Sequence, residues 1–227
     1  MLALGRLVSL AVSAGLLAAV LTGCGRGGSA VPVSAVYVSQ AVPSTVIGAT
    51  SMHVTGRYAW PGSTLAVSTD LLASGQLSGE IVDDGAPMTV VDTGGRMYAE
   101  FTAGFLAFYR KSAECAALCG KYLPARPSLA DGLIASMGVT ATRDILVGMA
   151  LSASSVTTVT FAGRPALRAV VAGRGYARGA YLIVSATSEC LPLKADNPGH
   201  YVLTFSRWDK VPAPASPPAA QIYAGAW

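Results

Sequence analysis

Two blocks of short segments with two-residue periodicity most constrain the fold of this chain. The first block contains five such segments, separated by turn pairs such as Pro61-Gly62, Asp84-Gly85 and Gly94-Gly95. Alternating apolar and polar residues at this spacing are typical of strands with one buried face, and the glycine pairs favour tight hairpins. The block therefore predicts an antiparallel meander with strands at Met52–Ala59, Leu65–Leu71, Leu77–Val82, Met88–Val91 and Met97–Phe101.

The second block repeats this pattern later in the chain. Its predicted strands are Val156–Phe161, Ala166–Val171, Ala180–Ala186, Leu191–Lys194 and Tyr201–Phe205. About ten antiparallel strands in one chain are expected to twist and curl into a curved sheet. The sequence therefore predicts an α+β fold in which helices cover the concave face of this sheet.

Helical spacing marks the region between the blocks and the segment before them. The predicted helices are Val33–Ala49, Gly104–Lys111, Leu129–Met137 and Arg143–Leu151. Pro43 is expected to end or kink the first helix, because proline lacks the backbone donor. Asp144 is placed near the start of the last helix, where a negative charge complements the helix dipole.

The N-terminal segment indicates export. After Arg6, an apolar stretch from Leu7 to Val20 leads into Leu21-Thr22-Gly23-Cys24, which matches the lipobox of bacterial lipoproteins. An ordinary signal peptide with a cysteine nearby is the less favoured alternative. We expect a signal peptide over 1–23, an acylated Cys24 with a flexible tether over 24–32, and one domain over 33–227. The protein would then be anchored by its acyl chains to the outer face of the cell membrane.

Charge and composition exclude one partner class and hint at another. The net charge of +4 comes from scattered residues without a basic cluster, so nucleic acid is not an expected partner. Only 12% of the residues are charged, whereas about 25% is typical. The domain therefore has either a very dry core or an apolar surface that contacts something else.

Cysteines and histidines are few. An exported chain is oxidised, so Cys115, Cys119 and Cys190 predict one disulfide and one remaining thiol. A Cys115–Cys119 pair is favoured if the segment is a turn and is awkward in a regular helix, while pairing of either with Cys190 stays open. His53 and His200 lie away from the cysteines in sequence, so we expect no metal site and no cofactor. No G-x-S-x-G nucleophile motif is present, and an enzyme is not expected.

Several segments, in this order and spacing, resemble the LppX/LprG group of actinobacterial lipoproteins, which are relatives by fold of the LolA and LolB carriers. They are His53-Val54-Thr55-Gly56, Gly94-Gly95-Arg96-Met97-Tyr98, Gly120-Lys121-Tyr122, Tyr181-Leu182-Ile183-Val184, Leu191-Pro192-Leu193, Leu203-Thr204-Phe205-Ser206-Arg207-Trp208 and Pro212-Ala213-Pro214. The resemblance implies a half-barrel that binds acyl chains of a lipid or lipoglycan and passes them along the envelope, with an envelope transport protein as a further partner. It implies no catalytic residues, and Cys115-x-x-x-Cys119 and Cys190 depart from it.

Candidate cavity residues follow from the apolar faces of the predicted helices and, more weakly, of two strands. They are Phe105, Leu106, Tyr109, Leu133, Ile134, Met137, Ile145, Leu146 and Met149 on the helices and Leu65, Val67, Met88 and Val90 on the strands. The leading hypothesis is a lipid-binding or lipid-transfer lipoprotein. The alternative is a non-transporting lipoprotein that uses the same fold as a protein-docking or sensory module.

Overall fold

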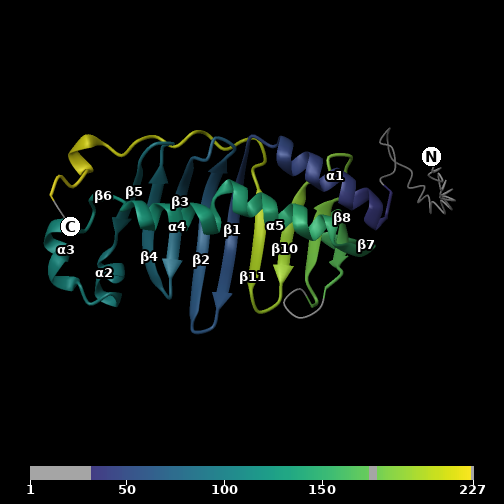
Figure 1. The fold of residues 1–227 in the computed structure, drawn as a ribbon, viewed down its shortest axis with the longest axis horizontal. Coiled ribbons are helices and arrows are strands. Elements are labelled where there is room, and N and C mark those ends of the chain that lie inside the picture. The colour runs from purple at the N-terminus through teal and green to yellow at the C-terminus, as the bar shows by residue number, and fades with distance from the viewer. Residues whose placement is uncertain (1–31, 174–177, 226–227) are drawn as a thin grey trace, which may run out of the picture.

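A computed structural model describes residues 32–173 and 178–225 of the chain. Its main feature is a single curved, unclosed sheet of 11 antiparallel strands (Figure 1). The strands are β1 Ser51–Trp60, β2 Ser63–Leu72, β3 Leu77–Asp83, β4 Ala86–Asp92, β5 Met97–Phe101, β6 Tyr122–Pro124, β7 Ala153–Phe161, β8 Arg164–Val171, β9 Tyr181–Ser185, β10 Pro192–Asn197 and β11 Tyr201–Ser206.

The strand order is β6-β5-β4-β3-β2-β1-β11-β10-β9-β8-β7, so the two predicted meanders lie side by side. They join where β1 pairs with β11, with His53 opposite Ser206 and Tyr58 opposite Tyr201. This arrangement confirms the predicted α+β half-barrel. The sequence did not predict β6, which is three residues long and lies at one edge of the sheet.

The helices pack on one face of the sheet. They are α1 Ala35–Gly48, α2 Ala103–Phe108, α3 Cys115–Leu118, α4 Pro127–Met137 and α5 Val139–Leu151, with short 3-10 turns η1 Ser112–Glu114 and η3 Ala219–Gln221. α4 and α5 follow one another across the strands (Figure 1). Gly138 separates them, and a Cβ atom there would lie 2.4 Å from the carbonyl oxygen of Ile134.

Two details of the helix predictions differ from the structure. Pro43 was expected to end or kink the first helix, but it does not end α1, which continues to Gly48. Val38, Val42 and Val46 form a fully buried stripe along α1, and this packing outweighs the cost of proline, about 3 kcal/mol. α5 begins at Val139 rather than Arg143, so Asp144 lies beyond the first turn, where the dipole effect has faded.

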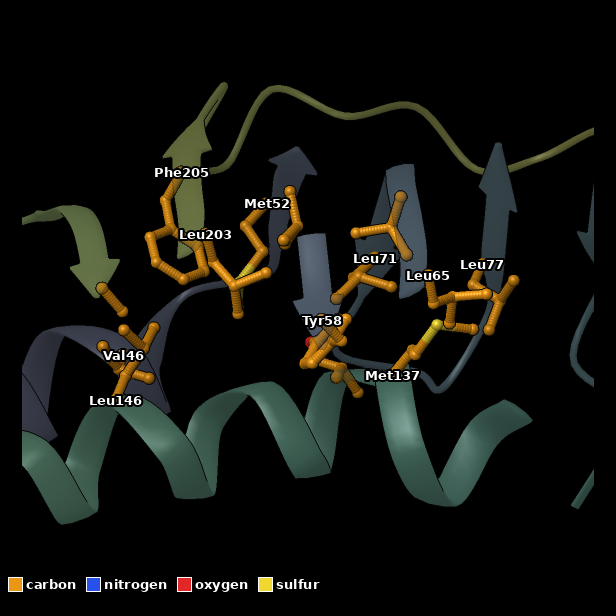
Figure 2. Close-up of a cluster of buried hydrophobic side chains, with 14 of the residues drawn as sticks. Val46, Met52, Tyr58, Leu65, Leu71, Leu77, Met137, Leu146, Leu203 and Phe205 are labelled. Carbon is orange, nitrogen blue, oxygen red and sulfur yellow. The ribbon is translucent and has the colours of Figure 1, made fainter. Parts of the chain in front are cut away.

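The hydrophobic core lies between the sheet and the helices. Side chains from β1, β2, β3 and β11 point toward α4 and α5, and Val46 of α1 lies close to Leu146 of α5 (Figure 2). By length and composition alone, the helical segment Ala130–Leu151 is long and apolar enough to cross a membrane. In this fold Leu146 and Met149 are instead buried against the rest of the core. The core cluster draws on residues between Val33 and Tyr223, so this part of the chain has its own hydrophobic core.

The C-terminal strap, residues 209–223, runs along the ends of β1 to β5 and reaches β6 (Figure 1). It begins where the backbone amide of Val211 donates to the hydroxyl of Ser51 at 3.1 Å. It ends where Ile222 forms a parallel bridge with Tyr122 and the amide of Tyr223 donates to the Tyr122 carbonyl at 2.9 Å. β6 is therefore held by β5 on one side and by the strap on the other.

Candidate ligand-binding cavity

A cavity of about 320 Å³ lies at the end of the molecule formed by α2, η1 and α3. Its walls come from β5 and from the segment that connects β5 to β6. Most of the lining side chains are apolar, and two carry charges. The lining residues are Phe101, Phe105, Leu106, Tyr109, Lys111, Glu114 and Leu118.

An aromatic series connects the core to the surface along this cavity. The ring of Phe105 stacks on that of Phe101 with centroids 4.6 Å apart, and Tyr109 lies 4.7 Å beyond Phe105. Phe108 packs edge-on against Tyr109 at 5.1 Å. Phe101 is buried and Phe108 is 50% exposed, so the series offers an apolar route from solvent into the interior.

Local capping fixes α2 against the sheet. The hydroxyl of Thr102 accepts the amide of Phe105 at 3.0 Å and donates to the Pro87 carbonyl on β4 at 2.8 Å. Threonine is a good N-cap because its oxygen satisfies a free helical amide. At the other end of α2, the hydroxyl of Tyr109 donates to the carboxylate of Asp83. This hydrogen bond raises the pKa of Tyr109 to about 12.

A disulfide between Cys115 and Cys119 shapes the opposite wall. α3 ends at Leu118, and Cys119 is already extended, so the backbone turns back and brings the two Cα atoms within 4.8 Å. Leu118, inside this closed loop, lines the cavity. Cys190 is a free thiol elsewhere in the core, and burial raises its pKa to about 11.

The charged residues of the cavity are paired. The ammonium of Lys111 lies 3.1 Å from a carboxylate oxygen of Glu114, and both side chains are about half exposed. This exposure places the pair at the mouth of the cavity, whereas Leu106 and Leu118 form its buried part.

Only three of the thirteen candidate cavity residues lie around this cavity: Phe105, Leu106 and Tyr109. The structure places the others in or against the core, where they fill the space between helices and sheet, or at the surface. Met137, Leu146, Met149, Leu65, Val67, Met88 and Val90 are buried in the core cluster, Leu133 and Ile145 pack partly buried against it, and Ile134 is exposed.

Four of the lining residues were not predicted from the sequence: Phe101, Lys111, Glu114 and Leu118. Phe101 precedes Phe105 and Tyr109 at a spacing of four residues, and this aromatic repeat could have indicated the series. Lys111 and Glu114 reach the cavity from η1, and Leu118 reaches it from inside the disulfide loop that follows. The turn that the disulfide closes has no periodic pattern that would predict it from the sequence.

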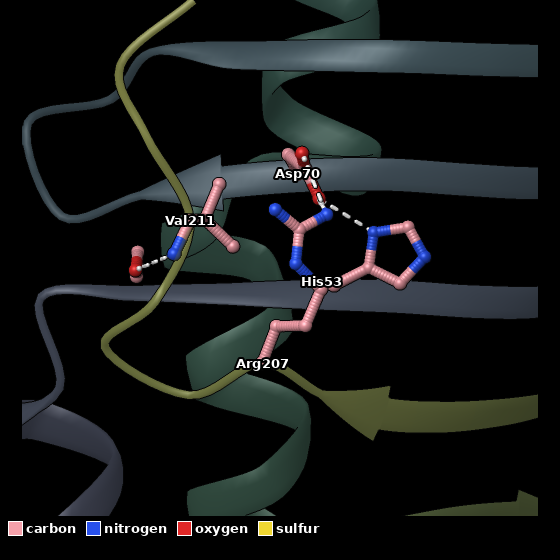
Figure 3. Close-up of polar contacts among 5 residues, drawn as sticks. His53, Asp70, Arg207 and Val211 are labelled. Atoms are coloured by element: carbon pink, nitrogen blue, oxygen red, sulfur yellow. Dashed lines mark hydrogen bonds and ion pairs between the residues drawn. The ribbon is translucent and has the colours of Figure 1, made fainter.

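A separate polar cluster lies on the sheet face away from the helices (Figure 3). Nδ1 of His53 lies 2.5 Å from Asp70, and the guanidinium of Arg207 lies 3.4 Å from both Asp70 oxygens. Arg207 lies two residues before the strap, so this cluster helps to fix the position where the strap begins. Within residues 32–173 and 178–225, no group of three or more His, Cys, Asp or Glu residues could hold a metal ion.

Comparison with known proteins identifies a fold. No protein-family model matches the chain, and no curated protein matches it in sequence. The crystal structure of LprF from Mycobacterium bovis matches with a TM-score of 0.52 over 80% of this chain and 96% of that chain, at 14% sequence identity. The chain therefore has an LprF-like fold. Cys24, the predicted signal peptide and most of the predicted tether lie outside the residues that the structure describes.

Proposed function

We propose that this protein is an exported lipoprotein of the LppX/LprG type, which holds acyl chains in an apolar cavity and helps to transfer lipid within the cell envelope. The lipobox ending at Cys24 supports anchoring at the outer face of the membrane. The LprF-like fold supports the family assignment, since LprF is a lipoprotein of that family.

The observation that carries the proposal is the apolar cavity beside α2. Its deep wall consists of the side chains of Phe101, Leu106 and Leu118, none of which contains a polar atom. Burial of each CH₂ group there contributes about 0.8 kcal/mol, so an acyl chain is retained without any covalent step. Release to an acceptor, for instance an envelope transport protein, then requires only that the cavity opens.

A second function, docking of a partner protein without lipid transport, is favoured by a different observation. Where α1 and α5 meet β11 the space between the helices and the sheet is filled, because Val46, Leu146 and Leu203 are fully buried there. At the same time Val36, Ile47 and Leu151 are each more than 60% exposed, although they are large and apolar. Exposed apolar side chains on one surface are typical of interaction sites. Val36 and Ile47 are about three turns apart on α1, so both lie on the same side of that helix.

Native mass spectrometry and lipid extraction of residues 25–227 distinguish the two functions. This part of the chain includes the whole described core. If the protein carries lipid, lipid should co-purify with the wild type and be absent from the Leu118→Trp variant, because the larger side chain enters the cavity. Ile134→Trp, on the exposed surface of α4, is the matched control and should keep the lipid. A wild-type protein that stays free of lipid after incubation with envelope lipids would contradict carriage and support docking.

A further inference from the structure

We propose that the cavity takes the single acyl chain of a zwitterionic amphiphile, with a phosphate of the head group at Lys111 and an ammonium at Glu114. This inference rests on the proposed lipid-binding function and specifies its ligand class. It follows from three features: the limited hollow space, the apolar depth of the cavity and the charge pair at its mouth.

The hollow space accommodates one chain. A volume of about 320 Å³ lies at the lower end of the range of roughly 300–1,000 Å³ for small-molecule pockets. Its deep end is closed by Phe101, Leu106 and Leu118, each of which is at most 5% exposed. A second or third chain would require these packed side chains to move apart.

The depth of the cavity suits a chain without polar groups. Phe101, Leu106 and Leu118 are at most 5% exposed and offer no hydrogen-bonding atom from their side chains. The hydroxyl of Tyr109 already donates to Asp83. A polar group inserted to this depth would lose its hydrogen bonds to water without replacement, at a cost of several kcal/mol.

The mouth offers one charge of each sign. Of the seven lining residues, Lys111 and Glu114 are the charged ones, and they lie 3.1 Å apart. A fatty-acid carboxylate near Lys111 would also be repelled by Glu114. A head group that contains both a phosphate and an ammonium gives each side chain an opposite charge, so it fits this pair better.

The test compares three probes on residues 25–227: palmitoyl lysophosphatidylethanolamine, palmitate and dipalmitoyl phosphatidylethanolamine. Dissociation constants are measured by displacement of a fluorescent fatty acid and stoichiometry by native mass spectrometry. The variants are Lys111→Met and Glu114→Gln. Lys210→Met and Glu80→Gln serve as matched controls, because both residues are exposed and neither lines the cavity.

Glu114→Gln should weaken lysophosphatidylethanolamine binding and strengthen palmitate binding, each by roughly two- to five-fold, the range for half-exposed charge pairs. Lys111→Met should weaken both ligands, and the controls should change neither. Wild-type protein should bind one single-chain lipid per chain and bind the two-chain lipid at least tenfold more weakly.

Equal affinity for the two-chain lipid would overturn the single-chain assignment. A Glu114→Gln variant that leaves both affinities unchanged, or moves them in the same direction, would overturn the head-group assignment while lipid binding itself stands. Failure of the wild-type protein to bind any of the three probes would instead overturn the proposed function together with this inference.

Discussion

The hydroxyl of Tyr109 donates a hydrogen bond to the carboxylate of Asp83, and this bond ties the end of α2 to the hairpin between β3 and β4. Because Tyr109 also lines the cavity, the same side chain both forms the wall and fixes its position. The bond requires a protonated hydroxyl, which is why the pKa of Tyr109 rises from 10.0 to about 12.

The Tyr109→Phe variant should show this coupling as a change in stability with pH. The raised pKa means that the bond contributes fully below the unfolded pKa of 10.0 and is lost as pH rises toward about 12. Tyr109→Phe should be less stable than the wild type by at most about 1 kcal/mol at pH 8. The difference should shrink between pH 10 and 12 in urea unfolding, and curves that stay parallel over this range would contradict the assignment.

Leu146→Ala should destabilise the fold strongly, because Leu146 is fully buried between α5, α1 and the sheet. Large-to-small changes in a packed core cost about 2–5 kcal/mol through lost burial and the cavity left behind. Ile134→Ala, at a position 38% exposed, should cost less than about 1 kcal/mol. Urea unfolding monitored by circular dichroism measures both, and equal losses would show that α5 does not pack as described.

The double variant Cys115→Ser/Cys119→Ser should release bound ligand faster than the wild type. The disulfide closes a short loop, so its effect on global stability is small, on the order of 1–2 kcal/mol. Its local effect is larger, since Leu118 inside the loop forms part of the cavity wall. A thiol reductant should increase the dissociation rate of the wild type and leave that of the variant unchanged. If the reductant also changes the rate of the variant, its effect does not come from this disulfide.

Cys190 should resist alkylation in the folded protein. Its thiol is fully buried, and burial raises its pKa to about 11, so little thiolate is present at pH 8. Folded residues 25–227 should gain no label from iodoacetamide. The denatured protein should gain one label without a reductant and three labels with a reductant. Rapid labelling of the native protein would mean that the β9–β10 region opens.

Truncation after Pro218 should loosen β6. The strap supplies the bridge from Ile222 to Tyr122 and the backbone hydrogen bond from Tyr223 to Tyr122. Their loss should lower the free energy of opening by about 1 kcal/mol, which corresponds to roughly five-fold faster amide exchange. Lys121→Met, which removes only the side-chain bond to the Ala220 carbonyl, is the control. Exchange should accelerate over Tyr122–Pro124 and stay constant in β1, and a uniform increase would indicate global destabilisation instead.

The sheet was largely predictable from sequence because its strands carry their own signals. In β2, for example, every second residue from Leu65 to Leu71 is buried, and the residues between them are small or polar. Hairpin glycines mark the ends of several strands. β6 was missed because three residues are too few to show a period. Pro43 does not end α1, because the buried valine stripe of the helix packs against the core, and this tertiary packing outweighs the local preference of proline.

The cavity was harder to predict because periodicity identifies an apolar face but not what covers it. Leu146 and Phe105 both lie on apolar helix faces, yet Leu146 meets a filled core while Phe105 faces a hollow. The difference arises where the chain turns back through Cys115–Cys119, and that return depends on contacts between elements.

The pairing of β1 with β11 has a consequence for the order of folding. Each meander consists of hairpins between neighbours in sequence, and such local contacts form early and quickly. The seam between Tyr58 and Tyr201 joins distant parts of the chain, so it closes only after the last strand has emerged. Until then the first meander presents β1 as an open edge, to which a second unfinished chain can add. If the chain is exported N-terminus first, as proposed, it depends on the timely arrival of β11 to prevent aggregation.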